Sequence, residues 1–111
     1  NDNEEWQSTI RHIAIEGKCF FINSDMYFTK DMYPRDMQRP DDINWLPEQV
    51  CRGGSCIIDP YGHYETEPLW DEEGIIYASL DLEKVPKSRM EFDPCGHYSR
   101  PDVTELIIHE K

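Results

Sequence analysis

The chain contains four cysteines that could act as nucleophiles, and they lie at Cys19, Cys51, Cys56 and Cys95. A nucleophilic cysteine needs a neighbouring base or cation that lowers the pKa of its thiol. Cys95 is followed two positions later by His97. Cys51 adjoins Arg52. Neither pair lies in a recognisable nucleophile motif, so the residues alone indicate no catalytic cysteine.

The sequence also contains no recognisable motif for binding a metal ion or a phosphate group. Structural zinc sites usually carry their ligands in tight cysteine pairs, whereas four residues separate Cys51 from Cys56. The acidic residues form no D-x-[DN]-x-[DN]-G calcium loop. The sequence also contains no P-loop and no G-x-G-x-x-G motif. We therefore predict neither a metal ion nor any other cofactor.

The charge of the chain limits its partners. It has 111 residues, with 23 Asp and Glu against 11 Lys and Arg, and a formal net charge of −12. Nucleic acid and anionic membrane surfaces both attract a surplus of Lys and Arg, so neither is expected to bind here. No apolar run reaches the length of a membrane span. Cysteines in apolar runs pack as small hydrophobes, and this favours a reducing, cytoplasmic location.

A predicted hairpin over residues 53–64 organises the elements around it. Residues 55–58 form a short apolar strand, and Pro60 with Gly62 supplies the turn. The paired glycines Gly53 and Gly54 allow a neighbouring backbone to approach closely. The return strand is expected over 64–67, and residues 68–70 are expected to lead away from it.

The residues before the hairpin predict a helix and then a strand. In the helix, over 2–16, Trp6, Ile10, Ile13 and Ala14 share one face. The strand covers 19–28 and ends in polar residues, beginning with Asn23. Ligands tend to bind at the carboxyl ends of strands in α/β sheets. These polar residues could therefore line a pocket or simply begin a loop.

The remaining segments complete an α/β chain with a mixed sheet. Residues 29–52 are predicted as a long loop with a helical turn at 47–50, anchored by Trp45 and Leu46. A strand is predicted over 74–81, a helix over 82–93, and an extended tail over 103–109. Pro86 suits this helix only in its first turn. The single domain would leave much apolar surface exposed.

A series of collinear motifs resembles the nitrilase and cyanide hydratase branch of the carbon–nitrogen hydrolase superfamily. The most specific motif is Gly-His-Tyr-Ser-Arg-Pro-Asp-Val at 96–103. The others lie at 6–7, 12–14, 16–20, 52–55, 59–62, 68–70, 73–75, 80–82 and 92–93. Together they cover nearly the whole chain.

This resemblance implies an α-β-β-α sandwich and a Glu–Lys–Cys triad. In that family the cysteine attacks the nitrile carbon, the glutamate moves protons and the lysine stabilises the tetrahedral intermediate. A thioimidate and then an acyl-enzyme are hydrolysed to carboxylic acid and ammonia. The substrate would be a small nitrile or cyanide. The alternatives are a cyanide hydratase, which forms formamide, and a catalytically inactive dimerisation module.

The chain departs from the family pattern because it lacks the triad. The family nucleophile lies in a Cys-Trp-Glu motif upstream of the helix predicted here, and no cysteine of this chain precedes a Trp. We therefore expect residues 1–111 to be the C-terminal portion of an incomplete carbon–nitrogen hydrolase domain. This portion should contain no catalytic residue and should be inactive by itself.

The resemblance assigns two further groups of residues. The end of the strand that follows the helix lies beside the family's substrate pocket, and here it contains Asn23, Asp25 and Met26. The helix corresponds to one that builds the family's dimer interface, and here it contains Ile10, Ile13 and Ala14. We therefore expect a homo-oligomer. The alternative for Ile10 and Ile13 is a face packed into the chain's own core.

Overall fold

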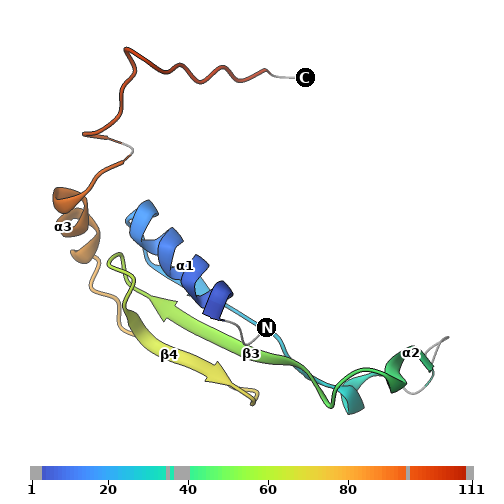
Figure 1. Ribbon diagram of the computed structural model, residues 1–111. Coiled ribbons are helices and arrows are strands. Elements are labelled where there is room, and N and C mark those ends of the chain that lie inside the picture. Colours follow the sequence, from blue (N-terminus) through green and yellow to red (C-terminus); the bar gives the residue numbers. More distant parts are fainter. Residues whose placement is uncertain (1–3, 35, 37–40, 95, 110–111) are drawn as a thin grey trace.

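The computed structural model describes residues 4–34, 36, 41–94 and 96–109 (Figure 1). In order, the elements are α1 (Glu4–Gly17), β1 (Phe21–Asn23), β2 (Tyr27–Thr29), the 3-10 helix η1 (Lys30–Met32), α2 (Asp41–Asn44), β3 (Gln49–Ile58), β4 (Tyr64–Trp70) and α3 (Lys84–Glu91). Helices and a sheet in one chain confirm the predicted α/β class. None of the helices in this described part combines the length and apolar character of a membrane-spanning segment.

Helix α1 confirms the helix predicted over residues 2–16, as far as the described residues extend. Acidic residues fill its first turn, where negative charge complements the helix dipole. Gln7, Ile10 and Ala14 are buried, because residues three and four positions apart lie on one face of a helix. This face packs against the sheet (Figure 1).

Strand β3 is the centre of the sheet, and it pairs along both edges. One edge pairs with β1 near its C-terminus, where Phe21 lies opposite Ile58. The same edge pairs with β2 near its N-terminus, where Phe28 lies opposite Cys51. Strand β4 lies along the other edge. We expected a mixed sheet, and the strand pairs of the described residues are all antiparallel.

The strand predicted over 19–28 is interrupted, so that it forms β1 and β2 instead of one element. Both strands keep the same register against β3, which places residues 24–26 opposite the segment that contains Gly53 and Gly54. These glycines have φ of 85° and 113°, which takes β3 out of regular strand geometry here. A Cβ at Gly54 would lie 2.7 Å from the Trp70 ring. A Cβ at Gly53 would lie 3.0 Å from the Leu69 carbonyl oxygen, so the predicted close approach of a neighbouring backbone is confirmed at Gly53.

The core is small and lies between α1 and β3. Ile10 and Ala14 of the helix pack with Cys56 and Ile58 of the strand, and all four are fully buried. Large apolar side chains elsewhere are exposed, as predicted. They include Ile22, Trp45, Ile75, Tyr77, Leu106 and Ile108. The proposed anchoring role of Trp45 is wrong, because 76% of this residue is exposed.

Other predictions differ from the structure at element boundaries. The helical turn lies in α2 and not at 47–50, because Gln49 and Val50 already belong to β3. Strand β4 continues through 68–70, which we expected to leave the sheet. Residues 74–81, which we predicted as a strand, form none. Helix α3 confirms the predicted helix, with Pro86 in its first turn.

Candidate functional site

Asn23 is the buried polar residue that ends β1, and its side-chain amide joins two parts of the candidate site. The amide nitrogen Nδ2 donates one hydrogen bond to the carbonyl oxygen of Gly54, at 3.2 Å. It donates a second to Oδ2 of Asp25, at 3.0 Å. The two hydrogens of one amide group can supply both bonds. Asn23 therefore ties the Asp25 carboxylate to the backbone of β3.

Ser55 on β3 holds the backbone of Asp25, which lies in the segment between β1 and β2. Its hydroxyl oxygen accepts a hydrogen bond from the Asp25 N–H, at 2.9 Å, and donates one to the Asp25 carbonyl oxygen, at 3.2 Å. The backbone N–H and C=O of Asp25 are thus paired with a side chain instead of with a neighbouring strand. Backbone and side chain of Asp25 are each held by a separate partner.

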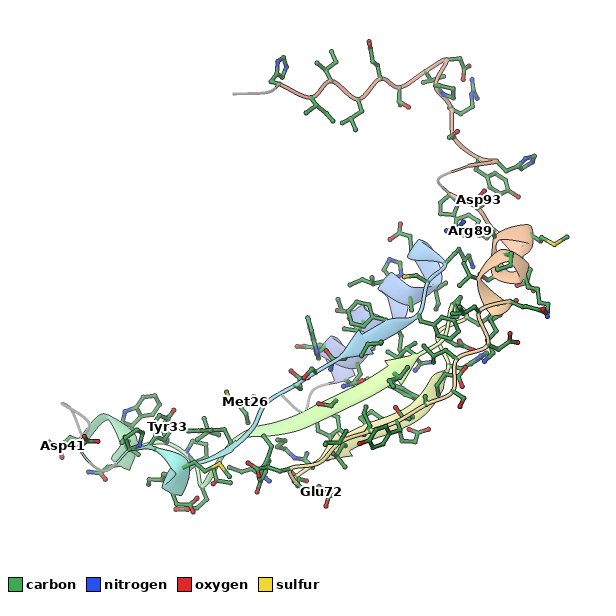
Figure 2. All side chains as sticks on the ribbon, turned by 180° about the vertical axis from the view of Figure 1, so that it is seen from behind. Met26, Tyr33, Asp41, Glu72, Arg89 and Asp93 are labelled. Carbon is green, nitrogen blue, oxygen red and sulfur yellow. The ribbon has the colours of Figure 1, made fainter. Side chains whose placement is uncertain are left out.

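A cleft of about 200 Å³ opens beside Asp25. Its lining residues include the largely apolar Tyr27 and Leu69 and the acidic residues Glu72 and Glu73. Figure 2 shows Glu72 just beyond the end of β4, on the opposite side of β3 from Met26. Clefts that mix apolar walls with a few polar groups are typical small-molecule sites.

The structure brings together two of the three residues predicted for a pocket. Asp25 lines the cleft, and Asn23 holds its carboxylate. Met26 is 62% exposed and is absent from the lining of this cleft. Its role at a pocket, like that of the other two, stays a prediction.

Helix α1 supports the site through Gln7, which was not among the residues predicted for the pocket. Its amide nitrogen donates to the Gly54 carbonyl oxygen, at 3.4 Å, and its amide oxygen accepts from the Tyr64 hydroxyl, at 2.9 Å. The carbonyl of Gly54 therefore receives hydrogen bonds from both α1 and Asn23. A polar amide on the apolar face of the helix was the signal that could have revealed this contact.

The comparison with known proteins decides the family. The model of the family described as carbon–nitrogen hydrolase matches residues 3–90. The chain belongs to the carbon–nitrogen hydrolase family.

Relatives of this carbon–nitrogen hydrolase chain include nitrilases from several kingdoms. The chain is 38% identical to an aliphatic nitrilase of Sinorhizobium fredii, covering 100% of the chain and 36% of the relative. It is 40% identical to an arylacetonitrilase of Trametes versicolor, covering 95% and 33%. It is 35% identical to a bifunctional nitrilase/nitrile hydratase of Lupinus angustifolius, covering 99% and 33%. The chain thus spans about a third of the length of these curated relatives, and its C-terminal position in them stays a prediction.

The buried Cys56 of this carbon–nitrogen hydrolase chain lies in surroundings unlike those of an activated nucleophile. Burial raises the pKa of the Cys56 thiol to about 11, and the negative charges of Asp25 and Glu67 add to this effect. Cys56 is therefore a neutral thiol near pH 7. Cys19 and Cys51 are half-buried and free, and Cys95 lies outside the described residues. Across the described part of the chain, no three His, Cys, Asp or Glu side chains form a group suited to a metal ion.

A second charged cluster joins the hairpin turn to α3. The Asp59 side chain is 4% exposed and accepts hydrogen bonds from the N–H groups of Tyr61 and His63, each at 2.9 Å. The Lys84 ammonium lies 3.0 Å from Asp59 and also pairs with Glu65. Burial raises the pKa of Asp59, but these hydrogen bonds outweigh it, so the pKa lies below its ordinary value. Both carboxylates raise the pKa of Lys84.

The residues predicted for an oligomer interface divide into two groups. Ile10 and Ala14 are fully buried in the core of this chain. For Ile10 this is the alternative that the sequence left open, whereas Ala14 was predicted for the interface alone. Ile13 is 41% exposed, so it is the residue of the three that a partner could contact.

Proposed function

We propose that the full-length protein containing this chain is a nitrilase that converts a nitrile to a carboxylic acid and ammonia. The observation that carries the proposal is the similarity to proteins named as nitrilases, which extends over 95% to 100% of the chain. The cleft beside Asp25 supports it, because it could form part of the wall of a small substrate pocket.

In the proposed reaction a Glu–Lys–Cys triad from outside this chain performs the chemistry. The cysteine sulfur bonds to the nitrile carbon, and the nitrile nitrogen takes a proton to give a thioimidate. Water adds to the thioimidate, and ammonia leaves to give a thioester. A second water then releases the acid and restores the thiol. The first step needs a thiolate, and all three steps need proton transfer and a cation beside the developing negative charge.

In this mechanism the 111 residues build the pocket and supply no nucleophile. The high pKa of Cys56 supports this division, because a neutral buried thiol is a poor nucleophile. The chain would position the pocket wall through Asn23 and Ser55, and Ile13 would contribute to an oligomer interface.

The name of one relative supports a second product, an amide. The Lupinus angustifolius protein is named as both a nitrilase and a nitrile hydratase. We propose that an amide could accompany the acid when the tetrahedral intermediate releases the thiol before ammonia leaves. The ratio of acid to amide measures how the intermediate partitions between these two routes.

The test is to supply aliphatic and arylacetonitrile substrates to the purified full-length protein and to measure ammonia, acid and amide. We expect ammonia and acid in equal amounts, with any amide making up the remaining product. The isolated 111 residues should release none of these. Failure of the full-length protein to hydrolyse any nitrile would contradict the proposed function, and turnover by the isolated chain would contradict the division of roles.

A further inference from the structure

We propose that Asp25 makes the cleft selective for nitriles that carry a positively charged amino group. The inference rests on the proposed function, because it names the substrate class of the same site. It follows from the charge of the cleft, the apolar parts of its wall and the way in which Asp25 is held.

The first observation is that three acidic residues, and no basic residue among those that the structure describes, line the cleft. Asp25, Glu72 and Glu73 all contribute to its lining. Among the described residues, none of these three carboxylates takes part in an ion pair. A cation in a partly dehydrated cleft would be attracted more strongly than in bulk water. An anionic substrate would be repelled for the same reason.

The second observation is that the cleft suits an organic cation and not a metal ion. No group of three potential ligands suited to a metal occurs among the described residues. Instead, Tyr27 and Leu69 supply apolar surface beside the carboxylates. An alkylammonium group could place its methylene groups on this surface and its charge toward Asp25.

The third observation is that Asp25 is held in place before any ligand arrives. Ser55 holds its backbone, and the Asn23 amide holds one carboxylate oxygen. Asn23 is itself bound to the Gly54 carbonyl. A group that is already ordered loses little conformational freedom when a ligand binds. Less of the favourable free energy of the charge interaction is then offset by lost entropy, and the preference for a cation is larger.

The surroundings of Cys56 also indicate a negative electrostatic potential near Asp25. Burial is the main cause of its raised pKa, and the charge of Asp25 adds to it. Negative charge at Asp25 thus already disfavours an anion at a neighbouring buried atom. The same field would favour a cation in the cleft.

The test uses three nitriles of matched length with the full-length protein at neutral pH. These are 4-aminobutyronitrile, which is a cation, pentanenitrile, which is neutral, and 4-cyanobutanoate, which is an anion. We expect kcat/KM to be about tenfold to a hundredfold higher for the cation than for pentanenitrile, the range typical of a hydrogen bond to a charged group. The anion should be the poorest substrate. The preference should weaken at high salt, because salt screens charge.

The decisive variant is Asp25→Asn, which removes the charge but keeps an oxygen that can accept the Asn23 hydrogen bond. It should lose most of the preference for the cation, so that its kcat/KM for 4-aminobutyronitrile falls toward the value that the same variant shows for pentanenitrile. The matched control is Glu105→Gln, which removes one charge from an exposed residue of the C-terminal tail. This control should keep the preference.

The outcomes separate this inference from the proposed function. Hydrolysis of pentanenitrile without a preference for the cation, or a preference that survives Asp25→Asn, would overturn the inference alone. If the protein hydrolyses no nitrile, the proposed function fails. Calorimetry with butylammonium then still tests the cleft, because binding that is lost in Asp25→Asn supports charge recognition and absence of binding overturns it.

Discussion

Gly54 is the residue on which the candidate site depends most, because its carbonyl oxygen accepts hydrogen bonds from two separate elements. Gln7 reaches it from α1, and Asn23 reaches it from the end of β1. Its φ of 113° lies in a region that residues with a Cβ rarely adopt. The Trp70 ring occupies the place where a side chain would begin.

We predict that Gly54→Ala destabilises the full-length protein by at least about 1 kcal/mol, since an alanine here is strained in φ. The clash of the new Cβ with Trp70 adds to this cost. The measurement is the free energy of unfolding in urea. The exposed Ser8→Ala on α1 is the control and should change it by less than about 0.5 kcal/mol. A Gly54→Ala protein as stable as the control would contradict the role assigned to this residue.

At the scale of elements, local patterns predicted the structure where a few neighbouring residues determine it. The spacing of Ile10 and Ala14 predicted that they share one face of α1, and both are buried, but Trp6 and Ile13 of the same predicted face are exposed. The turn at Pro60 and Gly62 predicted the hairpin. The strand expected at 74–81 failed because a strand needs a pairing partner, and apolar residues such as Ile75 remain exposed there instead.

The candidate site was predictable only in part for the same reason. Asn23 and Asp25 stood out because polar residues follow an apolar strand. Ser55, Gln7 and Glu72 come from three other parts of the chain. Their meeting depends on the register of β1 and β2 against β3 and on the packing of α1. Residue types and local spacing reveal neither the register of these strands nor the packing of α1.

The contact between α3 and the hairpin turn gives a prediction for pH dependence. The pKa of Asp59 is lowered in the folded chain, so its stabilising contribution is complete above its ordinary pKa of about 3.9. This contribution is lost as the pH falls below that value, toward the lower folded pKa. Lys84 remains charged throughout, because its own pKa is raised.

We therefore predict that Asp59→Asn lowers the stability of the full-length protein by about 1–2 kcal/mol at pH 7, by loss of a charged hydrogen bond. The difference from wild type should shrink as the pH is lowered from 5 to 3. Thermal unfolding across this range measures it. Asp102→Asn is the control, because Asp102 forms an exposed ion pair with the nearby Arg100 and should matter little. A difference that stays constant with pH would contradict the assignment.

At the scale of the whole molecule, the exposed apolar surface is large for so small a core. Among the residues that the structure describes, four form the fully buried apolar cluster, whereas many large apolar side chains on the helices, the sheet and the tail are exposed. The tail over 103–109 runs away from the sheet (Figure 1). Surface of this kind favours association with further polypeptide. The burial of Ile10 and Ala14 narrows the predicted contact on α1 to Ile13.

We predict that Ile13→Asp shifts the full-length protein toward a smaller oligomer, because it places a charge in the apolar contact proposed for α1. Sedimentation velocity measures the distribution of species, and circular dichroism shows whether the variant remains folded. The control is Ser8→Asp, an exposed position on the same helix that should leave the oligomer intact. Ile10→Asp should instead unfold the chain, because Ile10 is fully buried. If Ile13→Asp keeps the wild-type assembly while remaining folded, α1 does not supply the interface, and the exposed apolar residues of the tail become the candidates.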